Sequence, residues 1–310
     1  MNLYETLQNR INLYVKQSIK EAVDEEKVVK FNNNEVYPKN GIAVIMAGGA
    51  GSGKGYVINN FLPIDGKVFD VDHLKTLYSE LSTKEGSSIN AEDGYEYDFG
   101  NSDDVQRLHK KVSQKGWKGK SRRQFFQNQR RDNLQNVIFD ITGKGIKDIA
   151  QASTMCKEIG YTVYLVWVLT SRQRAMWQNL NRERRLNQKI FHDIHNAIYD
   201  FLPDFIKNGA AQYVDNVWLV FNSSMGLSQK TDEETTYTSI KLERNGNGFT
   251  IPQDVEKRIY DTLGVKETNP NNPQVYKDFD TLLTHTRDKM RVPVPQYGHD
   301  YNGNPNVYLK

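Results

Sequence analysis

The sequence predicts an α/β protein in which helices cover both faces of a parallel β-sheet. Two observations predict this fold class. Short apolar runs alternate along the chain with segments whose apolar residues recur at helical spacing. The runs are apolar at nearly every position, as expected for strands buried on both faces. The five runs that we expect to form strands are Ile42–Ala47, Lys67–Val71, Val137–Ile141, Tyr161–Leu169 and Val214–Phe221.

Helical patterns separate these runs and complete the order of the predicted elements. They are Lys54–Phe61, His73–Leu81, Ile146–Ile159 and Ser171–Leu186. Repeated alternation of strand and helix implies an open three-layer sandwich with a five-stranded parallel sheet. Ligands bind such sheets at the carboxyl ends of the strands, so we expect the functional residues there.

Three regions are expected along the chain. Residues 1–40 carry an amphipathic helix and a linker, residues 41–225 form the core, and residues 226–310 form an accessory C-terminal region. Inside the core, residues 84–131 are interpreted as a substrate insertion and residues 171–190 as a lid. The accessory region has weak local signals, which indicate a polar strand and a short helix at Thr235–Glu243 and Asp254–Leu263.

Composition excludes several classes of protein. Of the 310 residues, 37% are apolar and 25% are charged, which suits a packed core and not a disordered chain. The longest apolar run, Ile42–Ala47, is far shorter than the roughly 20 residues that cross a membrane. A single cysteine, Cys156, rules out an internal disulfide framework. We therefore expect a cytoplasmic protein with no membrane partner.

The net charge of +3 conceals a strong segregation of charge. Six acids and no base lie from Glu92 to Asp104, and ten bases and no acid lie from Val105 to Arg131. A second basic stretch, Ser171–Ile190, has six bases and one acid. An isolated basic stretch is more often a solvated helix face. Two such stretches that both contain aromatic residues strengthen the alternative interpretation, a phosphate-rich ligand. A nucleotide and a nucleic acid both fit this pattern.

A glycine-rich loop follows the first predicted strand and precedes the first predicted helix. This order is typical of a phosphate-binding loop, because glycines let main-chain amides turn inward and the helix N-terminus adds partial positive charge. Lys54 is placed to reach the β- and γ-phosphates of a nucleoside triphosphate, ATP or GTP. The predicted nucleotide-binding residues are Gly48, Gly49, Ala50, Gly51, Ser52, Gly53, Lys54, Gly55 and Tyr56.

Gly55 stands where most such loops place a serine or threonine whose hydroxyl binds Mg²⁺. Without that hydroxyl the metal needs water and a carboxylate. Asp140, in the apolar strand that ends Ile141-Thr142-Gly143, has the form of a Walker B acid, and Asp70 is the other candidate. A turn role is an equally good interpretation of Asp140.

A second acidic feature follows the strand Lys67–Val71. Asp70 and Asp72 are two residues apart, so they point to one side of the strand or straddle its end. Burying both carboxylates in an apolar strand without a function would cost free energy. Alternatively, Asp72 caps a helix that begins at His73.

The loop together with Asp72-x-x-Lys75 resembles the zeta-toxin and polynucleotide-kinase group of P-loop kinases, and also tailed-bacteriophage proteins of unknown substrate. The resemblance runs from about Gly41 to Ser223 and implies a P-loop NTPase fold. It implies that Asp72 is the general base and that Lys75 binds the acceptor, with Asp70 as the alternative carboxylate. If the source is viral, the compartment is the host cytoplasm.

The expected activity is transfer of the γ-phosphate of ATP to a hydroxyl of a nucleotide, nucleotide-sugar or nucleic-acid acceptor. The resemblance places an arginine lid after the fourth strand, with Arg182 and Arg185 as catalytic residues beside Asp72 and Lys54. The substrate-binding candidates are Lys75, Asp70, Arg122, Arg123 and Arg174, and Arg174 is also the third choice for the lid after Arg182 and Arg185.

Three alternatives stay open. A nucleoside monophosphate kinase shares the loop sequence, and a nucleic-acid end kinase would use the stretch Val105–Arg131. A non-catalytic, nucleotide-gated binding protein, such as a phage structural or host-takeover factor, would bind ATP and transfer nothing. The oligomeric state is open in each case.

Overall fold

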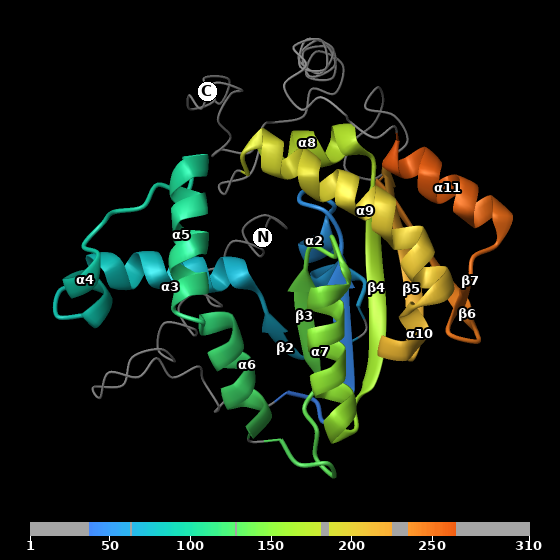
Figure 1. The fold of residues 1–310 in the computed structure, drawn as a ribbon, viewed down its shortest axis with the longest axis horizontal. Coiled ribbons are helices and arrows are strands. Elements are labelled where there is room, and N and C mark those ends of the chain that lie inside the picture. The colour runs from blue at the N-terminus through green and yellow to red at the C-terminus, as the bar shows by residue number, and fades with distance from the viewer. Residues whose placement is uncertain (1–36, 63, 128, 181–185, 225–234, 265–310) are drawn as a thin grey trace, which may run out of the picture.

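The computed structural model describes residues 37–62, 64–127, 129–180, 186–224 and 235–264 (Figure 1). In these ranges, the strands form one seven-stranded sheet in the order β2-β3-β1-β4-β5-β6-β7. The five parallel strands are β1 (Ile42–Ala47), β2 (Lys67–Phe69), β3 (Val137–Ile141), β4 (Thr162–Thr170) and β5 (Asn216–Ser224). The predicted five-stranded parallel sheet is therefore confirmed.

Two antiparallel strands extend the sheet beyond β5. They are β6 (Thr235–Asn245) and β7 (Gly248–Thr250). The helix α11 (Gln253–Leu263) follows them and buries Val255, Ile259 and Leu263 in the main hydrophobic core. The described part of the C-terminal region thus continues the sheet of the core.

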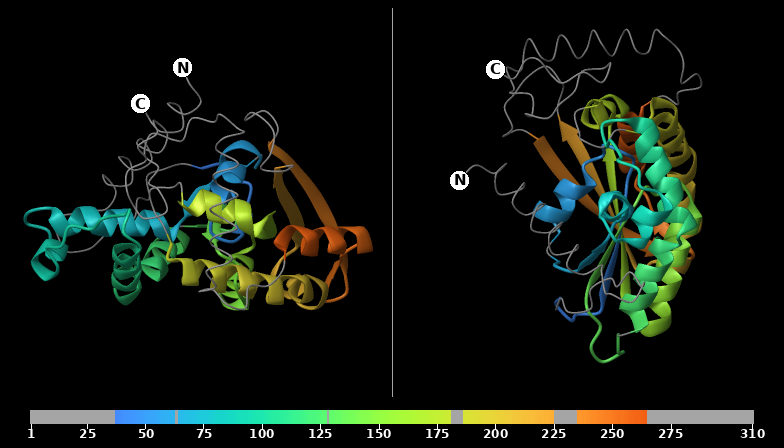
Figure 2. Two further views of the ribbon diagram at one scale, coloured as in Figure 1. Left: turned by 90° about the horizontal axis from the view of Figure 1, so that it is seen from above. Right: turned by 90° about the vertical axis from the view of Figure 1, so that its left-hand side faces the viewer.

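Helices lie on both faces of the sheet. One face is covered by α2 (Lys54–Asn60), and the other by α7 (Ile146–Ile159), α9 (Gln188–Asn208) and α11. Figure 2 shows the sheet edge-on between these layers. The other helices are α3 (Val71–Thr83), α4 (Ser88–Glu92), α5 (Ser102–Gln114), α6 (Trp117–Gln127), α8 (Arg172–Leu180) and α10 (Ala210–Tyr213). Within the described ranges, no helix is long and apolar enough to span a membrane.

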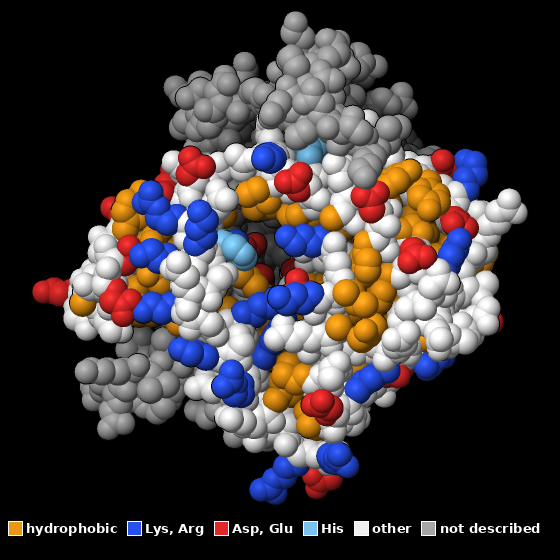
Figure 3. All heavy atoms as spheres, viewed as in Figure 1, with side chains coloured by type: hydrophobic (Ala, Val, Ile, Leu, Met, Phe, Trp, Pro, Cys, Tyr) orange, Lys and Arg blue, Asp and Glu red, His pale blue; other side chains and the backbone are white. Residues whose placement is uncertain are grey.

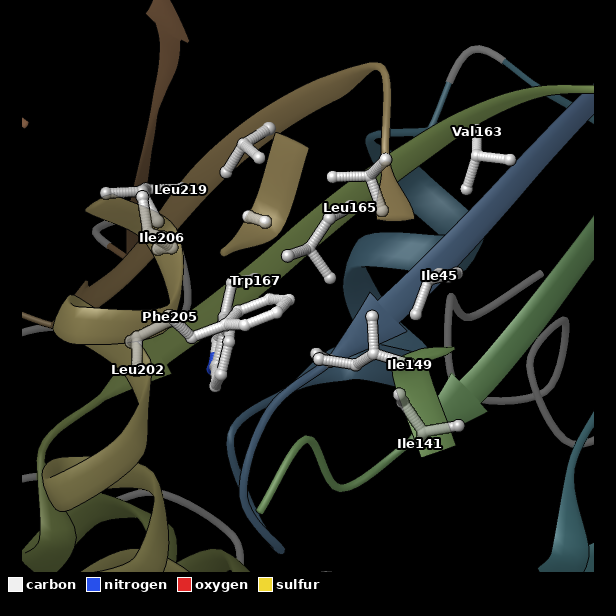
Figure 4. Close-up of a cluster of buried hydrophobic side chains, with 14 of the residues drawn as sticks. Ile45, Ile141, Ile149, Val163, Leu165, Trp167, Leu202, Phe205, Ile206 and Leu219 are labelled. Atoms are coloured by element: carbon white, nitrogen blue, oxygen red, sulfur yellow. The ribbon is translucent and has the colours of Figure 1, made fainter. Parts of the chain in front are cut away.

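The alternation of strand side chains explains why the strands are apolar throughout. In β1, Ala43, Ile45 and Ala47 face α7 and α9, while Val44 and Met46 face α2. Trp167 of β4 lies in the centre of the larger core cluster (Figure 4). Cys156 of α7 is part of the same cluster, and burial raises the pKa of its thiol to about 12. This cysteine is therefore a core residue and not a nucleophile.

Helices α3 to α6 form a separate lobe beside β2 (Figure 1). Its own core includes Leu74, Tyr78, Leu108 and Trp117.

The lobe also explains the segregation of charge along the sequence. Bases of the stretch Val105–Arg131 pair with acids that lie outside that stretch. Each of three ion pairs joins a base of 105–131 to such an acid, namely Lys111–Asp93 at 3.2 Å, Lys118–Asp148 at 2.6 Å and Lys115–Glu92.

The start of α3 differs from the sequence prediction. The strand β2 ends at Phe69, and α3 begins at Val71 instead of His73. Asp70 is the N-cap residue, and its Oδ1 accepts a hydrogen bond from the Asp72 backbone N–H at 2.8 Å. The prediction that Asp72 caps the helix is therefore wrong. Aspartate is a preferred N-cap, and Asp70 occupies that position first.

Some sequence predictions fall outside the described residues. The N-terminal helix predicted before residue 32 is one of them, as are the catalytic candidates Arg182 and Arg185. Most of the C-terminal region, from residue 265 onward, also lies outside the described ranges.

Candidate active site

The order of the strands brings three predicted features to one edge of the sheet. In the sheet, β3 lies between β2 and β1. The phosphate-binding loop (residues 48–55) follows β1, Asp140 lies near the end of β3, and Asp72 follows β2. Because the three strands are parallel, their carboxyl ends meet there. The loop, Asp140 and Asp72 therefore follow the ends of three neighbouring strands, in the order β1, β3 and β2.

Lys54 connects the loop to β3. Its Nζ donates hydrogen bonds to the carbonyl oxygens of Gly48 at 2.8 Å and Gly49 at 3.4 Å. The same Nζ lies 3.6 Å from Asp140 Oδ1, and the two side chains are 13% and 21% exposed. The ammonium group is thus held over the loop, next to the carboxylate that was predicted to bind the metal.

Two glycines of the loop differ in what surrounds them. Gly51 has φ +73°, and a Cβ there would lie 2.1 Å from the Ala175 carbonyl oxygen of α8. A Cβ at Gly55 would meet no other atom within 4 Å. Sterics therefore require glycine at 51 but not at 55. The Ser52 hydroxyl is buried, so it does not replace the hydroxyl that is missing at 55.

Asp72 and Lys75 form the second part of the site. Lys75 Nζ donates to Asp72 Oδ1 at 2.7 Å, one helical turn apart on α3. The Asp72 side chain is 38% exposed, whereas that of Lys75 is 8% exposed. The buried ammonium group orients a carboxylate that an acceptor can still reach.

His109 of α5 interacts electrostatically with Asp72 and with several lysines. Burial lowers the pKa of His109 on α5, and Lys75, Lys144 and Lys118 lower it further, while Asp72 opposes the shift. These residues come from four segments and are close enough to interact electrostatically. Figure 3 shows a hollow between the α3–α6 lobe and the sheet, with basic and histidine side chains at its rim and acidic side chains inside. The surroundings of Asp72 favour an anionic ligand.

The remaining predicted residues are more scattered. Arg122 is only 3% exposed, and its guanidinium carbon lies 4.8 Å from the centre of the Phe139 ring, against the sheet. Burial lowers the pKa of this arginine. Arg123 is exposed on α6, and Arg174 lies on α8, the helix that contacts the loop at Gly51. The structure therefore pairs Lys54 with Asp140 and Lys75 with Asp72 at the ends of neighbouring strands, and it leaves Arg122 in the interior.

Two buried residues that contact the loop were not predicted from the sequence. His195 Nε2 of α9 lies 3.1 Å from the Ala50 carbonyl oxygen, and Asn222 Nδ2 of β5 donates to the Ser52 carbonyl oxygen at 2.9 Å. The sequence shows His195 only as one of two histidines three residues apart. For Asn222 a weak signal exists, because it is a polar residue at the end of a buried strand.

His195 makes stability dependent on pH. Burial lowers the pKa of its imidazole from 6.5 to about 4, opposed by the Ala50 hydrogen bond and assisted by Arg172, His192 and Lys54. Between these two values the unfolded chain binds a proton that the folded chain does not, so stability is lost as pH falls below 6.5. From pH 7 to pH 5 we expect the unfolding free energy of the wild-type chain to drop by about 2 kcal/mol more than that of His195→Gln. Urea unfolding at both pH values measures this, and equal drops would contradict it.

Among solved structures, the PezAT chromosomal toxin–antitoxin system of Streptococcus pneumoniae is similar at 12% identity with a TM-score of 0.44, covering 90% of this chain and 96% of that chain. The AvrRxo1-ORF1:-ORF2 complex with ATP is similar at 12% identity with a TM-score of 0.46, covering 91% and 84%. No curated protein matches. The Zeta toxin family matches residues 25–239, more than half of the sequence, and the chain therefore belongs to the zeta-toxin family, with a P-loop kinase fold.

Proposed function

We propose that the protein is an ATP-dependent phosphotransferase that moves the γ-phosphate to a hydroxyl of a small, phosphate-bearing acceptor such as a nucleotide or nucleotide-sugar. One observation carries the proposal: Lys54 and Asp140 lie 3.6 Å apart on the loop side, and the Asp72–Lys75 pair lies at the next strand end. The order of the strands thus puts a triphosphate site beside a carboxylate that an acceptor can reach. Membership of the family supports the same activity.

Each residue has a role in this reaction. The amides of the loop and Lys54 bind the triphosphate. Asp72 takes the proton from the acceptor hydroxyl, whose oxygen attacks the γ-phosphorus while the bond to the bridging β,γ-oxygen breaks. ADP leaves with the resulting negative charge, which Lys54 and the loop amides stabilise. Phosphoryl transfer depends mainly on positioning and charge neutralisation, so these groups are sufficient.

The residues present fit a Mg²⁺ ion that arrives with the nucleotide. Within the described ranges, no cluster of three or more histidine, cysteine or carboxylate side chains forms a metal site. Mg²⁺ at a triphosphate needs only one or two carboxylates, since phosphates and waters complete its shell. Asp140 beside Lys54 is the first choice as its ligand, and Asp70 is the second. The ion would neutralise charge on the phosphates.

The lid is part of the proposal. The helix α8 contacts the loop, because the Ala175 carbonyl oxygen lies where a Cβ of Gly51 would be. Arg174 lies on this helix, and Arg182 and Arg185 follow it in the sequence outside the described residues. We assign these arginines to the triphosphate side, where they would stabilise charge on the leaving group.

The ion pairs of the lobe favour a small acceptor over nucleic acid. Lys111, Lys115 and Lys118 belong to the basic stretch that a nucleic-acid end kinase would use, yet each is paired with an acid. Such pairs leave less positive charge for a phosphate backbone. Lys75 and Lys144, which both act on His109 beside Asp72, form a smaller basic group, which suits one or two phosphates of a small molecule.

Transfer of label from γ-³²P-ATP tests the proposal directly. The wild-type chain is incubated with γ-³²P-ATP, Mg²⁺ and one acceptor at a time: a nucleotide-sugar, a nucleoside monophosphate or an oligonucleotide with a free 5′-hydroxyl. We expect label on a nucleotide or nucleotide-sugar, and none when EDTA replaces Mg²⁺. Label on the oligonucleotide alone would contradict the small acceptor. ATP binding without transfer to any acceptor would instead support the non-catalytic alternative.

A further inference from the structure

The side of the phosphate-binding loop that faces the protein interior rests on two buried polar side chains. His195 is 4% exposed and comes from α9, and Asn222 is 1% exposed and comes from β5. Each side chain contacts a carbonyl oxygen of the loop, at Ala50 and at Ser52. These contacts hold loop residues that are only two positions apart, from two different elements.

The His195 ring fills space that the loop leaves open. A Cβ at Gly49 would lie 2.6 Å from His195 Cε1, so the ring occupies the place of a side chain at that position. The ring of Phe191, one helical turn earlier on α9, lies 4.3 Å from the His195 ring, centre to centre. The imidazole is therefore packed between the helix and the loop, with little freedom to rotate.

The two carbonyl contacts determine where the loop amides point. In a trans peptide unit the C=O and the N–H point in opposite directions, and the described residues contain no cis peptide. His195 holds the Ala50 carbonyl oxygen on the interior side, so the N–H of the same peptide unit, which belongs to Gly51, points to the opposite side. Asn222 holds the Ser52 carbonyl oxygen in the same way, so the Gly53 N–H also points to the opposite side. These amides then point towards the concave side of the loop, where a phosphate binds.

We propose that His195 and Asn222 are positioning residues that hold the phosphate-binding loop in its phosphate-binding conformation. They contribute to nucleotide affinity without touching the nucleotide. The inference rests on the proposed function, because it requires a triphosphate in the loop.

The chemistry of the two side chains suits this task. A carbonyl oxygen only accepts hydrogen bonds, so the contact with Ala50 requires the hydrogen on Nε2 of His195. A neutral imidazole supplies that donor without placing a second positive charge near Lys54, and burial keeps the ring neutral at physiological pH by lowering its pKa. An amide is likewise a neutral donor. The cationic groups of the site remain on the phosphate side.

Substitutions at His195 separate positioning from packing. His195→Leu keeps a buried side chain of similar size and removes the donor, whereas His195→Gln keeps an amide N–H near the position of Nε2. Calorimetry with a non-hydrolysable ATP analogue is expected to show a dissociation constant raised about threefold to tenfold in His195→Leu, the effect of one hydrogen bond. We expect His195→Gln to stay within about twofold of the wild type.

A control and a second variant keep the test decisive. Ile206→Val removes a buried methyl group from the same helix, far along it from the loop. It is expected to lower the melting temperature by a few degrees, about the effect of one lost methyl group, and to leave the dissociation constant unchanged. Asn222→Ala tests the other contact, with the same weakening expected, and provides the result if His195→Leu does not fold.

The possible outcomes have different meanings. If the wild-type chain binds the analogue and both His195→Leu and Asn222→Ala bind it equally well, the positioning role is wrong while the proposed function stands. If Ile206→Val weakens binding as much as His195→Leu, the effect is general destabilisation and the inference also fails. If the wild-type chain does not bind the analogue, the proposed function itself is wrong.

Discussion

Replacing Asp72 by asparagine is expected to lower kcat for phosphoryl transfer by about 10²- to 10⁴-fold, the contribution of a general base. The substitution keeps the size of the side chain, and the amide oxygen can still accept from Lys75, which lies 2.7 Å from Asp72 Oδ1. The substitution removes the negative charge and, with it, the ability to take a proton. Because Asp72 lies on the acceptor side, the KM for ATP should stay within about threefold of the wild type. Steady-state kinetics with the acceptor found by the labelling experiment measure both constants.

Asp70→Asn is the matched control for this prediction. The Asp70 carboxylate accepts a hydrogen bond from the Asp72 backbone N–H as the N-cap of α3, and asparagine caps helices equally well. We expect this variant to keep its thermal stability and to lose no more than about tenfold in kcat. A large loss in Asp70→Asn with an active Asp72→Asn would reverse the assignment and make Asp70 the base.

Replacing Lys54 by methionine is expected to lower kcat by about 10²- to 10³-fold, as the loss of one preorganised cationic donor does elsewhere. The ammonium group donates to Gly48 and Gly49 and lies 3.6 Å from Asp140. It is therefore already at the junction of the loop and the predicted metal ligand, where charge develops on the leaving group. Methionine keeps the unbranched stem, so packing changes little. Single-turnover assays at saturating ATP separate the loss in rate from the loss in affinity.

Lys257→Met provides the comparison at a surface position. The Lys257 side chain is 75% exposed on α11 and pairs with Asp261 one turn away. Such exposed pairs contribute little to stability, so activity should stay within about twofold of the wild type. Equal losses of kcat in Lys54→Met and Lys257→Met would contradict the prediction. They would show that kcat depends on the net charge of the protein and not on the position of Lys54.

The strands and the phosphate-binding loop were predictable because their signals are local. Strands β1 and β3 begin and end as the apolar runs predict, and α7 spans the same residues as its helical pattern. A buried strand has to be apolar on both faces, and a loop around a phosphate has to be rich in glycine. Both requirements are visible in short stretches of sequence. The compartment and the resemblance to tailed-bacteriophage proteins stay predictions.

The interpretation of charge along the sequence was less successful. A stretch with ten bases and no acid looked like a surface for phosphate groups. In the structure Asp93 and Asp148, which lie outside that stretch, pair with Lys111 and Lys118. Arg122 is buried against Phe139. The charge of a segment depends on which segment packs against it, and this pairing is not a local property.

The sequence by itself determined the class of fold, the glycine-rich loop between the first strand and helix, and the presence of a carboxylate and a lysine after the second strand. Only the tertiary structure decided that Asp70 caps α3, that Lys54 lies next to Asp140, and that His195 and Asn222 support the loop. Periodicity and glycine content act over a few residues. The contacts of Lys54, His195 and Asn222 join residues far apart in sequence. Those of Lys54 and Asn222 exist because the sheet places β3 and β5 on either side of β1 and β4, and that of His195 exists because α9 packs against the same sheet.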